Sequence, residues 1–201
     1  MKIKDRSLAD CLAFFISAIC SPYITALVFI IIITYKYSNN LSQFLPWMIT
    51  FLLFGIVIPG LYVLWLIEIK KIKDIHIADQ NDRKTPFLIA GISAVVGTII
   101  LIYLNAARQV VVMAVTYSAN ALLVALITQY WKISIHMALF ASVATVAVIL
   151  FGPTYALLYL ILIPLAWSRI HRKRHTLLQA VAGALIAFVL TAAVFWLFGY
   201  L

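Results

Sequence analysis

The sequence predicts an all-α fold: a polytopic bundle of six to seven transmembrane helices that forms one integral membrane domain over residues 1–201. Two features of the composition indicate this class. Hydrophobic residues make up 66% of the chain and charged residues 10%, against roughly 45–50% and about 25% in soluble domains. The third observation is that the apolar residues gather in long runs. Because each span needs about 20 apolar residues, seven spans leave no room for a sizeable domain outside the membrane.

The expected spans follow the apolar runs along the chain. The first run is too long for the apolar core of a signal peptide, so we expect a retained span with Pro22 inside it. The third and fourth runs are separated only by 105–109, which predicts a tight hairpin with Arg108 at its tip. The fifth run is short and ends at Gly152 and Pro153. The seven runs cover 11–35, 46–67, 87–104, 110–130, 137–151, 155–167 and 176–199.

The cations are distributed unequally between the two sides of such a bundle. With seven spans, the N-terminus and the loops 68–86, 131–136 and 168–175 share one side, which carries 13 of the 15 Lys and Arg residues. The other side has only Lys36 and Arg108. Cytoplasmic loops carry such an excess of cations, so this side is predicted to be cytoplasmic. The net charge of +9 therefore reflects topology, and no nucleic-acid partner is expected.

Three segments on that side carry the groups that a phosphate ester requires. They contain Arg83 and Lys84, then Lys132, Ser134 and His136, then Arg169 and His175. Arginine and lysine neutralise phosphoryl oxygens, and a hydroxyl at a helix start binds the same anion. One histidine can attack phosphorus while another protonates the leaving oxygen.

The segments resemble the three motifs of the type 2 phosphatidic acid phosphatase (PAP2-like) superfamily of membrane lipid phosphatases. Those motifs are Lys-x6-Arg-Pro, Pro-Ser-Gly-His and Ser-Arg-x5-His-x3-Asp. The third is matched best, and here it reads Ser168-Arg169-x5-His175-x3-Gln179. The second is retained as Ser134-x-His136, and the first as Arg83 with Pro86 three residues later.

The resemblance implies a PAP2-like bundle that hydrolyses a membrane lipid phosphate without a metal or cofactor. The lipid would be of the phosphatidate type or a polyprenyl phosphate or diphosphate, in a bacterial or archaeal cytoplasmic membrane. It implies that His175 is the nucleophile, which forms a phosphohistidine, and that His136 is the general acid. The same resemblance assigns the phosphate to Arg83, Ser134 and Arg169, with Lys132 as an added cation. His76 stands where the family has the lysine of the first motif, and Lys73 or Lys84 is the candidate substitute for that lysine.

The chain departs from the family pattern at the residue that should orient the nucleophile. Gln179 stands where the family has an aspartate, and it cannot stabilise an imidazolium as a carboxylate does. In the serine-protease triad, the change from Asp to Asn costs about 10⁴ in rate. Asp74, Asp79 and Asp82 of the first segment are candidate replacements. Ile133 and Ile135 replace the proline and glycine of the second motif.

Two other functions are compatible with the sequence. A UbiA-like prenyltransferase would use Asp74, Asp79 and Asp82 to hold Mg²⁺ and a diphosphate, but the chain has no acid after Asp82 for a second acidic loop. A catalytically weak or inactive PAP2-like protein would bind an anionic lipid without turnover, which Gln179 favours.

Overall fold

A computed structural model describes residues 7–72 and 81–201 of the chain. Every element in these ranges is helical, which confirms the all-α class. Lys73, Asp74, His76 and Asp79 lie outside the described residues. The elements are α1 (Leu8–Ile19), α2 (Pro22–Tyr37), α3 (Leu41–Leu52), η1 (Leu53–Val57), α4 (Ile58–Glu68), η2 (Asn81–Arg83), α5 (Lys84–Tyr103), α6 (Arg108–Thr128), α7 (Ile135–Phe151), η3 (Pro153–Ile161), α8 (Leu162–His171) and α9 (Leu177–Leu197).

The described helices fit a multi-pass membrane protein. Six of them, counting consecutive helical segments together, are long and apolar enough to cross a membrane. The seventh apolar helix, α7, has 17 residues, or about 25 Å at 1.5 Å per residue. The predicted hairpin is present, because α5 ends at Tyr103 and α6 begins at Arg108. The described helices are therefore consistent with the expected six to seven spans.

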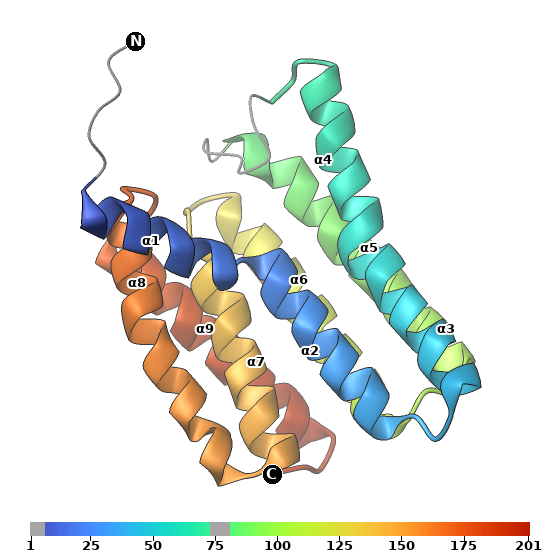
Figure 1. The fold of residues 1–201 in the computed structure, drawn as a ribbon. Coiled ribbons are helices and arrows are strands. Elements are labelled where there is room, and N and C mark those ends of the chain that lie inside the picture. Colours follow the sequence, from blue (N-terminus) through green and yellow to red (C-terminus); the bar gives the residue numbers. More distant parts are fainter. Residues whose placement is uncertain (1–6, 73–80) are drawn as a thin grey trace.

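The continuous helix expected over 11–35 is wrong, because two helices occupy this run. α1 ends at Ile19, and Ser21 is the N-cap of α2, its hydroxyl accepting a hydrogen bond from the Ile24 N–H at 3.4 Å. Pro22 takes the first position of α2, where its missing N–H costs nothing. The Ser-Pro pair thus starts a new helix, and α1 runs in a different direction from α2 (Figure 1).

Small and hydroxyl-bearing side chains hold the bundle together. α7, α8 and α9 form one side, and α3, α4 and α5 form the other, with α2 and α6 between them (Figure 1). The hydroxyls of Thr98 and Ser118 join α5 to α6 at 2.8 Å. Thr191 of α9 contacts both Ser142 of α7, at 2.9 Å, and the Asn120 amide of α6, at 3.2 Å. Such polar contacts between helices stabilise membrane bundles.

The start of α7 is fixed by a close approach to α9. A Cβ at Gly183 would lie 2.7 Å from the carbonyl oxygen of Ser134 and 3.3 Å from its nitrogen. The Ser134 N–H donates a hydrogen bond to the Gln179 carbonyl at 3.2 Å. Because only glycine leaves room for this backbone, α9 determines where residues 134–136 lie.

We expect Gly183→Ala to lower the free energy of unfolding by about 1–3 kcal/mol, because the added methyl group must displace the Ser134 backbone. Gly60→Ala is the matched control. A Cβ at Gly60 of α4 meets no atom within 4 Å, and alanine is the better helix former. Thermal unfolding in detergent measures both, and equal midpoints for the two variants would contradict the close approach.

Candidate functional site

A cavity of about 370 Å³ is lined by residues next to the starts of α5, α7 and α9 and by side chains of α1, α2, α4, α6 and α8. One end of the cavity is polar and is lined by Arg83, His136, Arg169, Arg172 and His175. Its deeper part runs between α2, α4, α6 and α7 and is mainly apolar. Side chains such as Ala26, Pro59, Val63 and Leu139 line that part. The structure therefore brings residues of all three predicted segments to one cavity.

Arg169 is a buried cation with few partners. It belongs to the last turn of α8 and is 6% exposed. One terminal nitrogen, Nη1, donates to the Ser17 hydroxyl of α1 at 2.5 Å. Within residues 7–72 and 81–201, its Nε has no hydrogen-bond partner and its guanidinium has no carboxylate partner. A buried charge in such surroundings is costly unless an anion compensates it.

Two more arginines lie on the wall of the same cavity. Arg83 immediately precedes α5, is 6% exposed and lies over the Phe87 ring, 5.9 Å from its centroid. Burial, and then the charge of Arg174, lower the pKa of Arg83. Arg172 lies over the ring of Phe14, with its Cζ 5.2 Å from the ring centroid. Because arginine stays protonated in proteins, the polar end of the cavity carries a concentrated positive charge.

His175 lies in the short connection between α8 and α9 and is 7% exposed. Burial lowers its pKa to about 3, and the charges of Arg169, Arg83 and Lys132 act in the same direction. The Gln179 side chain has the smallest effect and opposes the others. Within the described chain the buried Nδ1 has no hydrogen-bond partner. His175 is therefore a neutral imidazole at physiological pH.

The second motif is divided between the cavity and the interior. His136 is the second residue of α7 and lines the cavity. Ser134, the N-cap of α7, is fully buried against α9, and its Oγ has no partner among the residues described. The close contact with Gly183 accounts for this position. The structure thus does not bring Ser134 to the cavity wall.

The other predicted site residues lie around the cavity or beyond the described ranges. The Gln179 side-chain oxygen accepts a hydrogen bond from the Thr176 N–H at 3.1 Å and so caps α9. Lys132 lies near enough to influence the pKa of His175. Lys84 is the first residue of α5 and is absent from the cavity lining. Asp79 lies outside the described residues.

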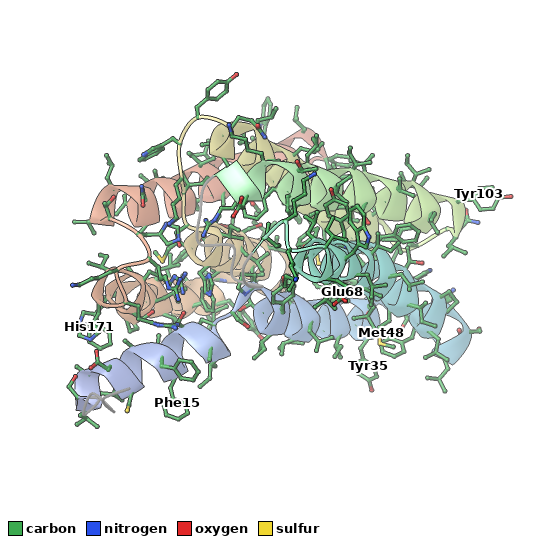
Figure 2. All side chains as sticks on the ribbon, turned by 90° about the horizontal axis from the view of Figure 1, so that it is seen from above. Phe15, Tyr35, Met48, Glu68, Tyr103 and His171 are labelled. Atoms are coloured by element: carbon green, nitrogen blue, oxygen red, sulfur yellow. The ribbon has the colours of Figure 1, made fainter. Side chains whose placement is uncertain are left out.

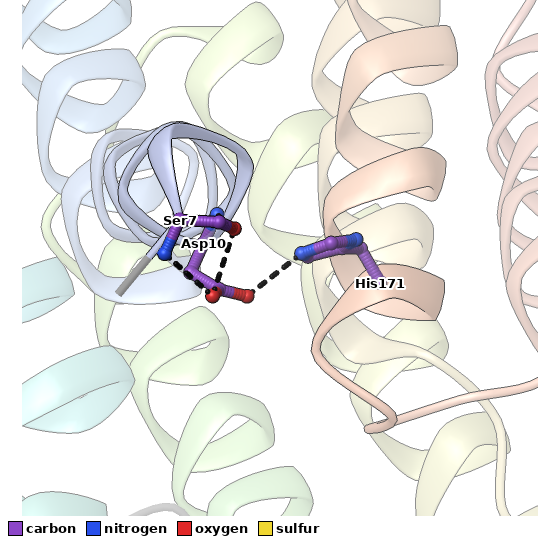
Figure 3. A network of polar contacts seen from close by, with 3 residues as sticks. All are labelled: Ser7, Asp10 and His171. Carbon is purple, nitrogen blue, oxygen red and sulfur yellow. Dashed lines mark hydrogen bonds and ion pairs between the residues drawn. The ribbon is translucent and has the colours of Figure 1, made fainter. Parts of the chain in front are cut away.

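Helix α1 contributes groups that belong to none of the three motifs. Ser17 contacts Arg169 and lines the cavity, as does Phe14 beneath Arg172. Asp10 binds the ring Nε2 of His171 at 2.9 Å, and Ser7 completes this network (Figure 3). Asp10 and Ser17 are seven residues apart, which puts two polar side chains on one face of an otherwise apolar helix. This spacing is the sequence feature that could have indicated that α1 turns a polar face toward the site.

The geometry suits an amphiphilic anion. Three arginines and two histidines surround one end of the cavity, and apolar side chains line most of the rest. Arginine binds phosphate through parallel hydrogen bonds, and an uncharged imidazole is a competent nucleophile toward phosphorus. Comparisons of the chain with protein-family models, curated proteins and solved structures give no match.

The depressed pKa of His175 predicts how stability changes with pH. The unfolded chain takes up a proton at this residue near pH 6.5, whereas the folded chain does so only near pH 3. Protonation of His175 therefore does not change the free energy of unfolding above pH 6.5. As the pH falls from 6.5 toward 3, it lowers the free energy of unfolding. Relative to His175→Gln, we expect the wild type to lose up to about 1.4 kcal/mol per pH unit in this window. Thermal midpoints of both proteins between pH 8 and pH 4.5 measure this difference, and parallel profiles would contradict a buried neutral histidine.

Proposed function

We propose that the protein is a metal-independent phosphatase that hydrolyses a phosphomonoester or diphosphate of a membrane lipid, as PAP2-like enzymes do. The observation that carries the proposal is the convergence of Arg83, His136, Arg169 and His175 on the polar end of one cavity. These residues come from three segments far apart in the sequence. The apolar remainder of the cavity supplies a place for the lipid chain, and the arginines supply charge for the phosphoryl oxygens.

The proposed reaction has two displacement steps. In the first, Nε2 of neutral His175 attacks phosphorus, the bond from phosphorus to the lipid oxygen breaks, and protonated His136 gives that oxygen a proton. In the second, water attacks the phosphohistidine, the P–N bond breaks, and His136 takes a proton from the water. Phosphate leaves, and both histidines return to their starting forms. Arg83 and Arg169 stabilise the charge on the transferring phosphoryl group.

The distribution of cations supports a cytoplasmic position for the cavity's polar end. The described loops at that end contain Lys70, Lys71, Lys132 and the run Arg172–Arg174, whereas Lys36 and Arg108 lie at the opposite end. On this proposal the substrate is taken from the cytoplasmic leaflet. Labelling of a single cysteine at residue 173 in intact and opened cells tests the orientation.

The test of the activity is phosphate release by the purified protein from lipid phosphates in the presence of EDTA. The panel contains a phosphatidate, a lysophosphatidate, a polyprenyl phosphate and a polyprenyl diphosphate, and release from one or more is expected. A ³²P-labelled substrate should leave a phosphoenzyme that is stable in alkali and labile in acid, as a phosphohistidine is. A folded protein that releases no phosphate and traps no label would refute the proposal.

A second candidate function is binding of a lipid phosphate without turnover. It is favoured by the Nδ1 of His175, which has no hydrogen-bond partner among residues 7–72 and 81–201, and by the cap that Gln179 provides to α9. No carboxylate within these ranges contacts His175, so none of them stabilises a phosphorylated imidazolium. Binding of lipid phosphate in the absence of release would identify this function. A UbiA-like transferase would instead require Mg²⁺ and a prenyl acceptor, and two of its three candidate acids, Asp74 and Asp79, lie outside the described residues.

A further inference from the structure

Helix α1 has an apolar face that no other described element covers. Leu8, Leu12, Phe15 and Ile19 follow one another at intervals of four, three and four residues, which places them on a single helix face. They are 77, 49, 60 and 65% exposed. Phe15 points away from the bundle (Figure 2). The face therefore requires an apolar environment outside the protein.

The polar side chains of α1 point in other directions, toward the bundle. Asp10 binds His171 of α8, and Ser17 accepts the hydrogen bond from Arg169. A helix at a water-exposed surface has the reverse arrangement, with apolar residues toward the core and polar residues outward. Ile24 and Val28 of the next helix, α2, are also exposed. Lipid is thus the environment that fits both helices.

The length and position of α1 exclude a spanning role. Its 12 residues extend about 18 Å, whereas the hydrocarbon core is about 30 Å thick. The stretch Leu8–Tyr37, which comprises α1, α2 and the two residues between them, has 30 residues, or about 45 Å in a straight helix, which is more than one span needs. α1 packs on α8 at the end of the bundle where His175 lies (Figure 1).

We infer that α1 is a membrane-surface helix that docks its face of Leu8, Leu12, Phe15 and Ile19 into the boundary between headgroups and acyl chains. The partner is the leaflet at the site end of the bundle. Because Phe14 and Ser17 of the same helix line the cavity, the leaflet supports one wall of the polar end. The inference does not depend on turnover at His175.

The test is the membrane depth of spin labels in the full-length protein in phospholipid vesicles. Cys11 and Cys20 are first replaced by alanine, and the folding of this background is checked by its thermal midpoint. Single cysteines then replace Leu8, Leu12, Phe15 and Ile19 and carry a nitroxide. The collision rates of each label with oxygen and with a water-soluble nickel complex give its depth. A control series at the exposed positions 178, 185 and 189 of α9 reports a spanning helix.

A surface helix predicts the same shallow depth for all four labels on α1, while the α9 labels become steadily deeper. A spanning α1 would give a depth change of about 16 Å between positions 8 and 19, and that result would overturn the inference. Two further outcomes would also overturn it. They are aqueous exposure of all four labels, and spin–spin broadening at position 15 that shows a second copy of the chain on this face. Depth is measured without substrate, so failure of the proposed phosphatase activity leaves the result interpretable.

Discussion

The replacement of His175 by alanine is expected to abolish phosphate release from lipid phosphates, with a loss of about 10⁴-fold or more. Removing a nucleophile that forms a covalent intermediate leaves only the contribution of binding. The phosphoenzyme should vanish in the same variant, since the attacking nitrogen is gone. Release of phosphate and trapping of ³²P from the best lipid of the panel measure both effects.

His171→Ala is the matched control for this experiment. His171 is four residues earlier, at the end of α8, and its ring is bound to Asp10 outside the cavity lining (Figure 3). The lost contact is partly solvent-exposed, and such pairs contribute little to stability. Activity within a few-fold of wild type is expected. A His175→Ala variant that keeps its activity, or a His171→Ala variant that loses it, would assign the chemistry to a different residue.

The sequence predicted the spans well because long apolar runs are a direct requirement of the bilayer. The start of α2 differs from the prediction for a specific reason. Proline is tolerated within membrane helices, so the apolar run alone predicts Pro22 inside a span. The serine before it is an N-cap, and serine followed by proline is also a helix-start signal. Hydropathy cannot distinguish these readings, because α1 and α2 are both apolar.

The site was predicted in part. Two spans separate each motif segment from the next, so the sequence predicts Arg83, His136, Arg169 and His175 on the same side of the membrane. In the structure these four residues line one cavity. Ser17 was not identified because it reaches Arg169 through the tertiary packing of α1 on α8. The buried position of Ser134 depends on the close contact of its backbone with Gly183. This contact joins two helices and is not part of any of the three motifs.

Arg169 should be unfavourable for stability and necessary for binding. Replacement by methionine keeps much of the side-chain volume and removes a buried charge that has no carboxylate partner among the described residues. Exchanging buried charges for apolar groups is often stabilising by about 1–4 kcal/mol, less here because the hydrogen bond to Ser17 is lost. We expect Arg169→Met to raise the thermal midpoint by a few degrees and to abolish phosphate release.

Orthovanadate, a phosphate analogue, separates these two effects of Arg169. An anion that binds only the folded protein stabilises it by about 2.7 kcal/mol at 100 times its Kd, so vanadate should raise the midpoint of the wild type. Without vanadate, the Arg169→Met variant should have a higher thermal midpoint than the wild type. Addition of vanadate should leave the midpoint of the variant unchanged. Lys71→Met removes an exposed cation and should leave the vanadate response intact. Should Arg169→Met unfold earlier than the wild type, the guanidinium would have a structural role, because a charge kept for an anion destabilises the protein when that anion is absent.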